Sequence, residues 1–218
     1  MQLGQSSNLA AQANSFFFLW QIGGVFTKSP QPFKGRGMAR QGKLSDHIQA
    51  GVTILFVGIN PGLRSAQVGH HFAGPSNRFW KLLYESQLVT EPLTYEDDRR
   101  LPEWGLGLTN IISRASRGID SLSDQEYREG LVALTRKVRR YRPRIVALLG
   151  VTMYRAVFGA ELALPRSIPL GVTTSQLAGV PIFLLPNPSG RNAHYTHEDM
   201  LAVFRSLRTY VEQDVVAP

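Results

Sequence analysis

Two apolar runs in this chain end in nearly the same way, on an asparagine that is followed by a proline. The run VTILFVG at 52–58 leads into GINPG at 58–62, and VPIFLLP at 180–186 leads into PNPSG at 186–190. Turn chemistry alone accounts for one such corner, because proline presets φ and glycine tolerates positive φ. Asparagine also offers one acceptor and two donors but takes no proton at neutral pH. If the two strands are neighbours in a sheet, both corners face one crevice, where such amides can hold a water without a general base.

An amide-only site suits a reaction in which bond breaking runs ahead of nucleophilic attack, because the water then meets a cation that needs little activation. Cleavage of an N-glycosidic bond through an oxocarbenium-like sugar is such a reaction. Between the corners, VGHHFAGPSNRFWKLL at 68–83 places Phe72 in a loop of glycine, histidine and proline. Phe72 either anchors this loop by packing or forms a platform on which a nucleobase stacks.

Three segments, GINPG, HHFAGPSNRFW and LPNPSGRNA, stand in this order along the chain. In them the chain resembles the bacterial mismatch-specific uracil-DNA glycosylases and the related thymine-DNA glycosylases, and the resemblance spans roughly residues 52–210. Three separated motifs in register are specific, whereas GINPG alone is weak. The resemblance implies a single α/β domain of the uracil-DNA glycosylase superfamily. Such a domain flips uracil, or thymine mispaired with guanine, out of the duplex and hydrolyses its glycosidic bond.

The resemblance assigns a role to each residue that matches a motif position. Asn60 would orient the attacking water, Phe72 would stack on the flipped base, backbone groups around Ile59 and Gly62 would read the pyrimidine edge, Ser65 would line the pocket near C5, and Asn187 would help to shape the pocket. The insertion loop would be Pro188, Ser189, Gly190, Arg191 and Asn192, entering from the minor-groove side to contact the widowed guanine. Arg191 stands at the intercalating position, where an arginine can stack and also pair with phosphate. As an ordinary loop residue it would be a solvated charge.

No carboxylate stands in the matching motifs. Asn110, in GLGLTNIISRAS, occupies a further position near the site that could carry an acid, and it is again an amide. Unless Asp46, Glu85 or Asp120 reaches the pocket, no carboxylate activates the water. We then expect modest turnover, with part of the driving force supplied by the leaving uracil anion. No lysine in the motifs is placed to form a Schiff base, which favours a monofunctional glycosylase.

Four histidines lie near the two candidate loops: His70, His71, His194 and His197. No carboxylate stands at a familiar ligand spacing and the family uses no metal, so we expect neither a metal nor another cofactor. We expect the histidines to line a DNA groove or to satisfy loop carbonyls. Trp80 and Trp104 are expected to be core residues.

RIVALLG at 144–150 is a third apolar run of strand length, and we expect it to form a buried strand like the other two. Three helical patterns lie between and after the strands, at 76–86, at 123–142 with the capping box Ser123-x-x-Glu126, and behind a second box, Thr196-x-x-Asp199. This alternation predicts a three-layer α/β/α sandwich with a short, largely parallel central sheet. In such sheets ligands bind beyond the carboxyl ends of the strands.

Chain length and composition limit the remaining classes of protein. The chain of 218 residues is long enough for one domain with a substantial core, and it has no cysteine for a disulfide or a thiolate metal site. Residues 1–42 are interpreted as a poorly ordered N-terminal extension, or as an artefact of the gene model if Met38 is the true start, and 43–218 as a single catalytic domain. No apolar run reaches the roughly 18 residues of a membrane span. We expect a monomer in a bacterial cytoplasm, acting at the nucleoid without membrane contact.

The net charge of +8 favours a polyanionic partner. Residues 1–42 hold four basic residues and no acid, so residues 43–218 carry 20 basic against 16 acidic residues. The partner that the resemblance implies is double-stranded DNA containing G·U or G·T mispairs. Two alternatives stay open: a mismatch-binding protein with little or no catalysis, and a small-nucleotide hydrolase. The latter is disfavoured because no phosphate-cradling glycine loop is present.

Overall fold

The computed structural model describes residues 44–159 and 164–214 of the chain. The predicted N-terminal extension at 1–42, with its alternative start Met38, lies outside the described residues. Within the described residues no helix is both long and apolar enough to cross a membrane.

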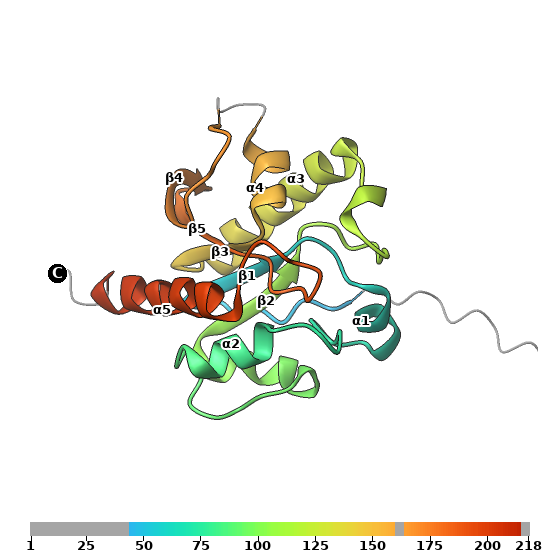
Figure 1. Ribbon diagram of the computed structural model, residues 1–218. Coiled ribbons are helices and arrows are strands. Elements are labelled where there is room, and N and C mark those ends of the chain that lie inside the picture. The colour runs from blue at the N-terminus through green and yellow to red at the C-terminus, as the bar shows by residue number, and fades with distance from the viewer. Residues whose placement is uncertain (1–43, 160–163, 215–218) are drawn as a thin grey trace, which may run out of the picture. The chain divides into compact units, whose positions relative to one another are not determined.

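A five-stranded sheet in the order β2-β1-β3-β5-β4 lies at the centre of the described residues (Figure 1). The pairs β1·β2, β1·β3 and β3·β5 are parallel, and β4 alone pairs in the antiparallel sense. The three predicted strands and the largely parallel sheet are therefore confirmed. The strands run from Ile54–Gly58 in β1, Leu106–Asn110 in β2, Ile145–Leu149 in β3, Gly171–Leu177 in β4 and Val180–Leu185 in β5.

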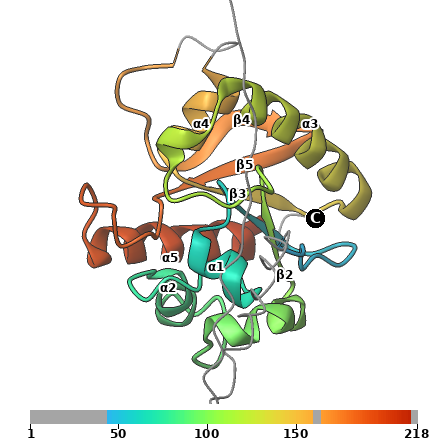
Figure 2. The ribbon, with the colours of Figure 1, turned by 90° about the vertical axis from the view of Figure 1, so that its right-hand side faces the viewer.

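Alternate residues of β1 point to opposite faces of the sheet and enter two separate cores. Ile54 and Phe56 pack with α2, α5 and the 3-10 helix η1, whereas Leu55 and Val57 pack with α3 and α4. Figures 1 and 2 show α3 and α4 over one face and α2 and α5 over the other, so the predicted three-layer sandwich is confirmed. The helices are α2 Phe79–Glu85, η1 Tyr95–Trp104, α3 Asp124–Tyr141, α4 Val151–Phe158 and α5 His197–Asp214.

Both predicted capping boxes form. The Ser123 hydroxyl accepts the Glu126 N–H at 3.3 Å while the Glu126 carboxylate accepts the Ser123 N–H at 2.9 Å, which starts α3. Before α5, the Thr196 hydroxyl accepts the Asp199 N–H at 3.1 Å and the Asp199 carboxylate accepts the Thr196 N–H at 2.9 Å. Because each box satisfies two backbone donors that a helix start leaves free, these two helices begin where the sequence predicts.

The two Asn-Pro corners do not lie on neighbouring strands, the condition considered in the sequence, because β3 lies between β1 and β5. The corners still share one edge, since all three strands are parallel and their carboxyl ends point the same way. Trp80 is a core residue at 7% exposure, and Trp104 is partly buried and packs against the same core while its Nε1 donates to the Thr90 hydroxyl.

Gly130 sets how closely α3 packs against the segment that follows β2. A Cβ at this position would lie 2.4 Å from the Ile111 carbonyl oxygen. Gly130→Ala is expected to lower the free energy of unfolding by about 1–3 kcal/mol through overpacking, although the same change in an open helix stabilises by roughly 0.5–1 kcal/mol. Urea denaturation measures the difference. Ala133→Gly, at an exposed position of the same helix, is the control for helix propensity, and a stabilised Gly130→Ala protein would contradict the packing argument.

Candidate active site

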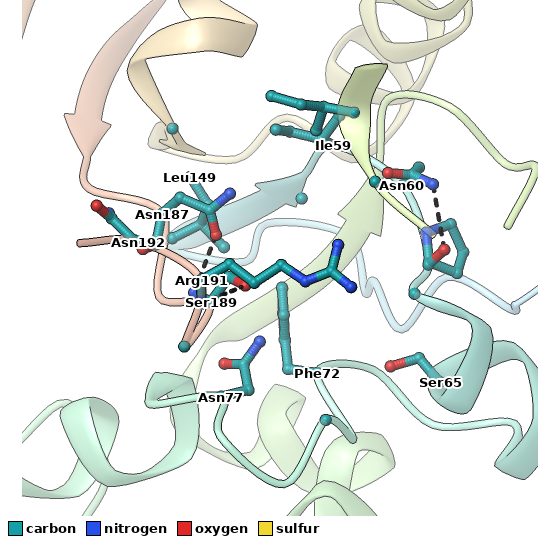
Figure 3. A pocket seen from close by; sticks show the side chains of 18 of the residues that line it. Ile59, Asn60, Ser65, Phe72, Asn77, Leu149, Asn187, Ser189, Arg191 and Asn192 are labelled. Carbon is teal, nitrogen blue, oxygen red and sulfur yellow. Dashed lines mark hydrogen bonds between the residues drawn. The ribbon is translucent and has the colours of Figure 1, made fainter. Parts of the chain in front are cut away.

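A cleft of about 710 Å³ opens at the carboxyl ends of the parallel strands (Figure 3). Such a volume is typical of ligand sites in proteins. Pro188, which is buried, does not line the cleft, although it belongs to the predicted insertion loop. The other predicted site residues all line it, namely Ile59, Asn60, Gly62, Ser65, Phe72, Asn110, Asn187, Ser189, Gly190, Arg191 and Asn192.

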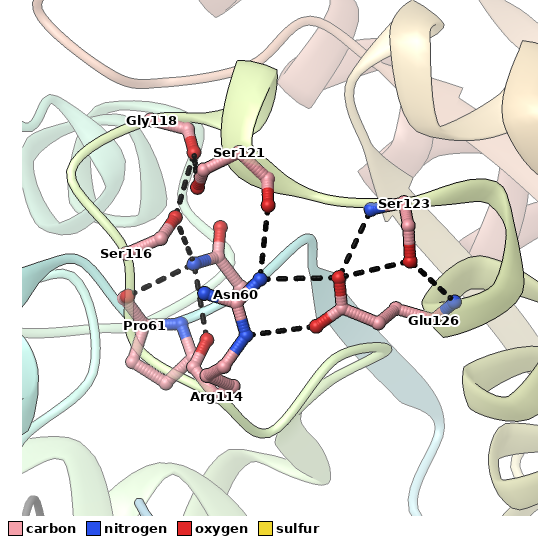
Figure 4. A network of polar contacts seen from close by, with 8 residues as sticks. All are labelled: Asn60, Pro61, Arg114, Ser116, Gly118, Ser121, Ser123 and Glu126. Atoms are coloured by element: carbon pink, nitrogen blue, oxygen red, sulfur yellow. Dashed lines mark hydrogen bonds and ion pairs between the residues drawn. The ribbon is translucent and has the colours of Figure 1, made fainter. Parts of the chain in front are cut away.

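The Asn60 amide is held in one orientation by three acceptors (Figure 4). Its Nδ2 donates to the Ser116 hydroxyl at 2.8 Å and to the carbonyl oxygens of Pro61 and Arg114 at 3.1 and 3.2 Å. The Ser116 hydroxyl gives its own proton to the Gly118 carbonyl at 2.6 Å, so it can only accept from Asn60. Because every partner is an acceptor, the nitrogen must face them. The Asn60 Oδ1 is left on the cleft side as an acceptor (Figure 3).

Arg114 ties this network to the start of α3. Its guanidinium forms two bonds to the Glu126 carboxylate, at 2.8 and 3.1 Å, and donates to the Ser121 carbonyl at 3.0 Å. The Arg114 guanidinium, together with the Ser123 N–H, lowers the pKa of Glu126 to about 2. The loop that carries the Asn60 acceptors is therefore fixed by the same carboxylate that caps a helix.

Gly58 lets a cleft side chain approach the end of β1. It pairs with Asn110 across the parallel ladder. A Cβ at Gly58 would lie 2.5 Å from the Asn110 Oδ1 and 3.4 Å from the Phe72 ring. The absence of a side chain at Gly58 therefore leaves room for the Asn110 amide, and the Phe72 ring lies at ordinary contact distance from the same corner.

Phe72 has the left-handed backbone conformation, with φ at 52°. For a residue other than glycine this costs roughly 1–2 kcal/mol, so the surrounding contacts must hold it. Its ring packs against Phe79 with centroids 4.2 Å apart, and it stays half-buried on the cleft wall. The sequence gives no signal for this conformation, because the usual residues at positive φ are glycine and asparagine. The ring is supported from behind and open to the cleft.

Hydrogen bonds on both sides of Phe72 impose this conformation. After it, the Ala73 N–H donates to the buried Ser65 hydroxyl at 3.0 Å, and the Ala73 carbonyl accepts from Arg64 Nε at 2.8 Å. Both partners lie on α1, Leu63–Val68, a short helix that the sequence patterns did not predict. Ser65 therefore lines the cleft as predicted, and its hydroxyl also holds the Phe72 loop.

A buried carboxylate that sequence reasoning missed holds the other side of the same loop. Asp98 is fully buried and accepts the His71 N–H at 2.8 Å and a bond from His70 Nδ1 at 3.0 Å, while His47 Nε2 lies 3.3 Å away. Burial raises the pKa of Asp98, but these histidine contacts outweigh it and bring the value to about 2. The sequence offers no way to predict these contacts, because the three histidines lie at least 27 residues before Asp98 and match no known motif spacing.

The histidines divide into three roles. His71 is buried and its Nε2 donates to the Ser45 carbonyl at 2.9 Å, as predicted for a histidine that satisfies a loop carbonyl. His194 is exposed on the cleft wall. His70 and His197 contact the carboxylates of Asp98 and Glu85 and are not among the residues that line the cleft.

Asn187 shapes the insertion loop through its side chain and its backbone carbonyl. Its Oδ1 accepts the Ser189 N–H at 3.0 Å, and its backbone carbonyl accepts from Asn192 Nδ2 at 2.9 Å. Gly190 lies directly against Ser76, because a Cβ on this glycine would come within 2.3 Å of the Ser76 hydroxyl. The loop is therefore a tight, internally bonded turn seated on the segment that follows Phe72.

Arg78 clamps the insertion loop, and sequence reasoning missed it. Its two terminal nitrogens donate to the carbonyl oxygens of Tyr195, Ser189 and Asn192 at 3.3, 3.2 and 3.1 Å, and its N–H donates to the Pro188 carbonyl at 2.9 Å. A lone arginine at the start of a helix carries no sequence signal for contacts more than a hundred residues away. Arg78 joins the segment that bears Phe72 to the loop that bears Arg191.

Arg191 reaches across the cleft to the opposite loop (Figure 3). Its Nη1 donates to the Arg117 carbonyl at 2.5 Å, and the rest of the residue is exposed. The guanidinium packs beside Gly118, where a Cβ would lie 3.4 Å from the same nitrogen, an ordinary contact distance. The Arg191 side chain therefore lies along the cleft and is tied to its opposite wall.

The family model of the uracil DNA glycosylase superfamily matches residues 45–208, which include every element that builds the cleft. The chain belongs to this superfamily. It is 36% identical over 160 residues to a G/U mismatch-specific uracil DNA glycosylase of Schizosaccharomyces pombe. That alignment covers 70% of this chain and 49% of the relative, so the chain spans about half the length of the relative.

A solved structure supports the fold of this superfamily member. The solution structure of a candidate uracil DNA glycosylase from Methanosarcina acetivorans superimposes with a TM-score of 0.50 and 18% sequence identity. The match covers 76% of this chain and 96% of the other. At this identity the likeness concerns the fold alone.

Of the three acids considered for the superfamily site, one reaches the cleft. Asp46 forms an ion pair with Lys137 at 2.8 Å, and Glu85 pairs with His197. Asp120 is exposed on the cleft wall and is the only acid among the described lining residues. The amides of Asn60 and Asn110 thus face a cleft with one carboxylate.

The contacts around His71 and Asp98 predict how stability depends on pH. Burial lowers the pKa of His71 below 6.5, so below that pH the unfolded chain binds a proton that the folded chain does not. The free energy of unfolding should fall as the pH drops below 6.5, and fall further between about 3.8 and 2 as Asp98 is protonated. His71→Gln should reduce the loss of unfolding free energy between pH 7.5 and 5.5, measured by urea denaturation at both pH values. His194→Gln, at an exposed histidine, should keep the wild-type difference; if both variants match wild type, His71 is not the titrating group.

Proposed function

We propose that this protein excises uracil from G·U mispairs in duplex DNA by hydrolysing the N-glycosidic bond, leaving an abasic site. Membership of the superfamily and the name of the Schizosaccharomyces relative support the reaction class. One observation carries the proposal. The Asn60 amide is anchored through its nitrogen, so its oxygen faces the same cleft as the Phe72 ring.

The proposed chemistry needs an acceptor rather than a base at Asn60. As the bond between C1′ and the base nitrogen breaks, its electron pair leaves with the uracil and the sugar becomes an oxocarbenium-like cation. A water held by the Asn60 Oδ1 then adds its oxygen to C1′ and releases a proton, which neutralises the departing uracil anion. Because an amide cannot take that proton at neutral pH, its contribution is to orient the water.

The walls of the cleft suit a flipped pyrimidine. The Phe72 ring offers a stacking surface, for which base–aromatic contacts contribute about 1–3 kcal/mol. The backbone near Ile59 and Gly62 and the amide of Asn110 offer donors and acceptors for the edge of the base. We propose that Arg191 leaves the cleft as the base enters and fills the gap in the duplex, with the turn at 187–192 facing the widowed guanine.

Thymine in G·T mispairs is a second proposed substrate, since one methyl group changes discrimination by only about 1–3 kcal/mol. We propose that the protein acts as a monomer on nucleoid DNA in the cytoplasm. The competing function is a mismatch-binding protein that marks G-containing mispairs without cutting them. The anchored amide of Asn60 favours the enzyme, because binding alone does not need an oriented water acceptor.

Asn60→Ala separates catalysis from binding. We expect excision at G·U to fall by about 100-fold or more because the water loses its orientation, while the affinity for the same duplex changes by less than about twofold. The assay uses labelled duplexes carrying G·U, G·T and A·U, with single-stranded uracil as a fourth substrate, followed by alkaline cleavage of abasic sites. Strand breaks at G·U support the enzyme. Wild-type binding without breaks would support the mismatch-binding protein, and loss of affinity together with activity would contradict the role of Asn60.

Arg78→Met tests the clamp on the insertion loop. If Arg78 acts by placing Arg191, Arg78→Met should slow single-turnover excision about 10- to 100-fold, and the effect should largely vanish in an Arg191→Ala background. Lys81→Met, an exposed cation of the same helix, is the matched control and should be near wild type. Arg78→Lys should recover only part of the rate, because one ammonium cannot bond three carbonyls as a guanidinium fork does. Additive effects of Arg78→Met and Arg191→Ala would show that Arg78 does not act through the loop.

A further inference from the structure

The positive charge of the folded domain is concentrated in one short segment, RKVRRYRPR at 136–144. Residues 43–218 hold 20 basic and 16 acidic residues, and this segment supplies six of the basic residues and no acid. The other residues of 43–218 therefore hold 14 basic against 16 acidic residues. Without the segment at 136–144, the domain would have no net positive charge.

This basic segment lies at the opposite edge of the sheet from the cleft. It comprises the last turns of α3 and the residues that lead into β3, and the Tyr141 carbonyl accepts the Gly51 N–H just before β1. It therefore sits at the amino ends of β1 and β3, whereas the cleft lies at their carboxyl ends. Five residues of strand separate the two edges by about 17 Å at roughly 3.3 Å per residue.

Four arginines of the segment are exposed and have no ion-pair partner among the described residues. Lys137 is partly buried and neutralised by Asp46 at 2.8 Å. Within the part of the chain that the structure describes, no carboxylate pairs with the exposed Arg136, Arg139, Arg140 or Arg142, and Arg140 stacks over Tyr141 at 5.2 Å.

Folding accounts for only part of this pattern. Arg139 and Arg140 lie in the last turn of α3, where a cation favours the helix dipole. Arg136 stands three and four residues before them, on the same side of the helix, and like charges at that spacing destabilise a helix. Arg142 lies beyond the helix, in the left-handed conformation with φ at 50°. A surface that concentrates repelling cations beyond what the helix end uses points to an anionic partner.

We propose that Arg136, Arg139, Arg140 and Arg142 form a second DNA-binding surface, which takes the phosphate backbone of a duplex segment other than the one in the cleft. Arginines without carboxylate partners suit phosphates, which they can bind through two parallel bonds. A duplex that places a base in the cleft crosses the carboxyl ends of the strands and meets these arginines only by wrapping around the sheet. The surface would let the protein hold one segment while sampling another. The inference uses the DNA-binding part of the proposed function and not the excision step.

The test is capture of a second duplex. Protein is saturated with an unlabelled 25-bp duplex that carries guanine opposite a tetrahydrofuran abasic analogue, to fill the cleft. A labelled, undamaged 25-bp duplex is then titrated, with anisotropy as the readout. The variant combines Arg136→Gln, Arg139→Gln and Arg140→Gln. It leaves Arg142 in place, because a change there would alter the end of α3.

Wild type should capture the second duplex, and the triple variant should bind it at least about tenfold more weakly. Its salt dependence should fall by about 0.9 in the slope of log K against log salt for each phosphate that the variant no longer neutralises. Excision at G·U should stay within about twofold of wild type, since none of the three residues lines the cleft. The matched control, Arg99→Gln with Arg128→Gln and Arg205→Gln, removes the same charge from exposed positions elsewhere and should keep capture within about twofold.

Three outcomes would overturn the second surface. They are equal capture by wild type and the triple variant, an equal loss in the control, and, when labelled single-stranded RNA is titrated in place of the duplex, tighter arginine-dependent binding of the RNA. Failure of the proposed function would look different. Wild type would then show no excision and no preference for the abasic duplex, while direct binding of undamaged duplex, compared between wild type and the triple variant, would still decide whether the arginines hold DNA.

Discussion

The orientation of one side-chain amide is the constraint on which the cleft depends. If the Asn60 amide turned by 180°, its oxygen would face three acceptors and its nitrogen would face the cleft, so a water there would meet a donor instead of an acceptor. The correct orientation requires the Ser116 hydroxyl to be an acceptor, and its bond to the Gly118 carbonyl ensures this. It also requires the Arg114 carbonyl in place, which the ion pair with Glu126 secures. Asn60 is therefore held by the start of a helix far along the chain.

The cleft wall opposite Asn60, which carries Phe72 and the insertion loop, is likewise held in place by hydrogen bonds from other parts of the chain. Phe72 adopts a conformation that costs energy, and bonds to the residues on both sides compensate for it. Arg78, a few residues later, bonds the carbonyls of the insertion loop. The aromatic platform and the loop are thus parts of one rigid wall facing Asn60. Rigid placement of this kind lowers the barrier of a reaction whose groups do little proton transfer.

The sequence predicts the parts of this molecule whose signals are local. Buried strands appear as apolar runs, and the boxes at Ser123 and Thr196 mark two helix starts, so both were found. The motif corners predicted Asn60 and Asn187, since parallel strands end at one edge. Asp98 and Arg78 were missed because their partners lie far away in sequence and neither residue type identifies them. Strand β2 was missed because its five residues contain a glycine and end in polar residues.

The distribution of charge separates two properties that many DNA-binding proteins combine on one face. Arg64, Arg117 and Arg191 line the cleft together with Asp120, but in the free protein Arg64 and Arg191 each donate to a backbone carbonyl. In the proposed function, recognition in the cleft would rest on shape, stacking and amide contacts, which salt affects little. Long-range attraction to phosphate would fall instead to the proposed surface at 136–142, at the other edge of the sheet, where screening acts strongly. A mismatch is rare among normal base pairs, so a protein built this way can stay near DNA through one edge without committing the cleft to undamaged sequence.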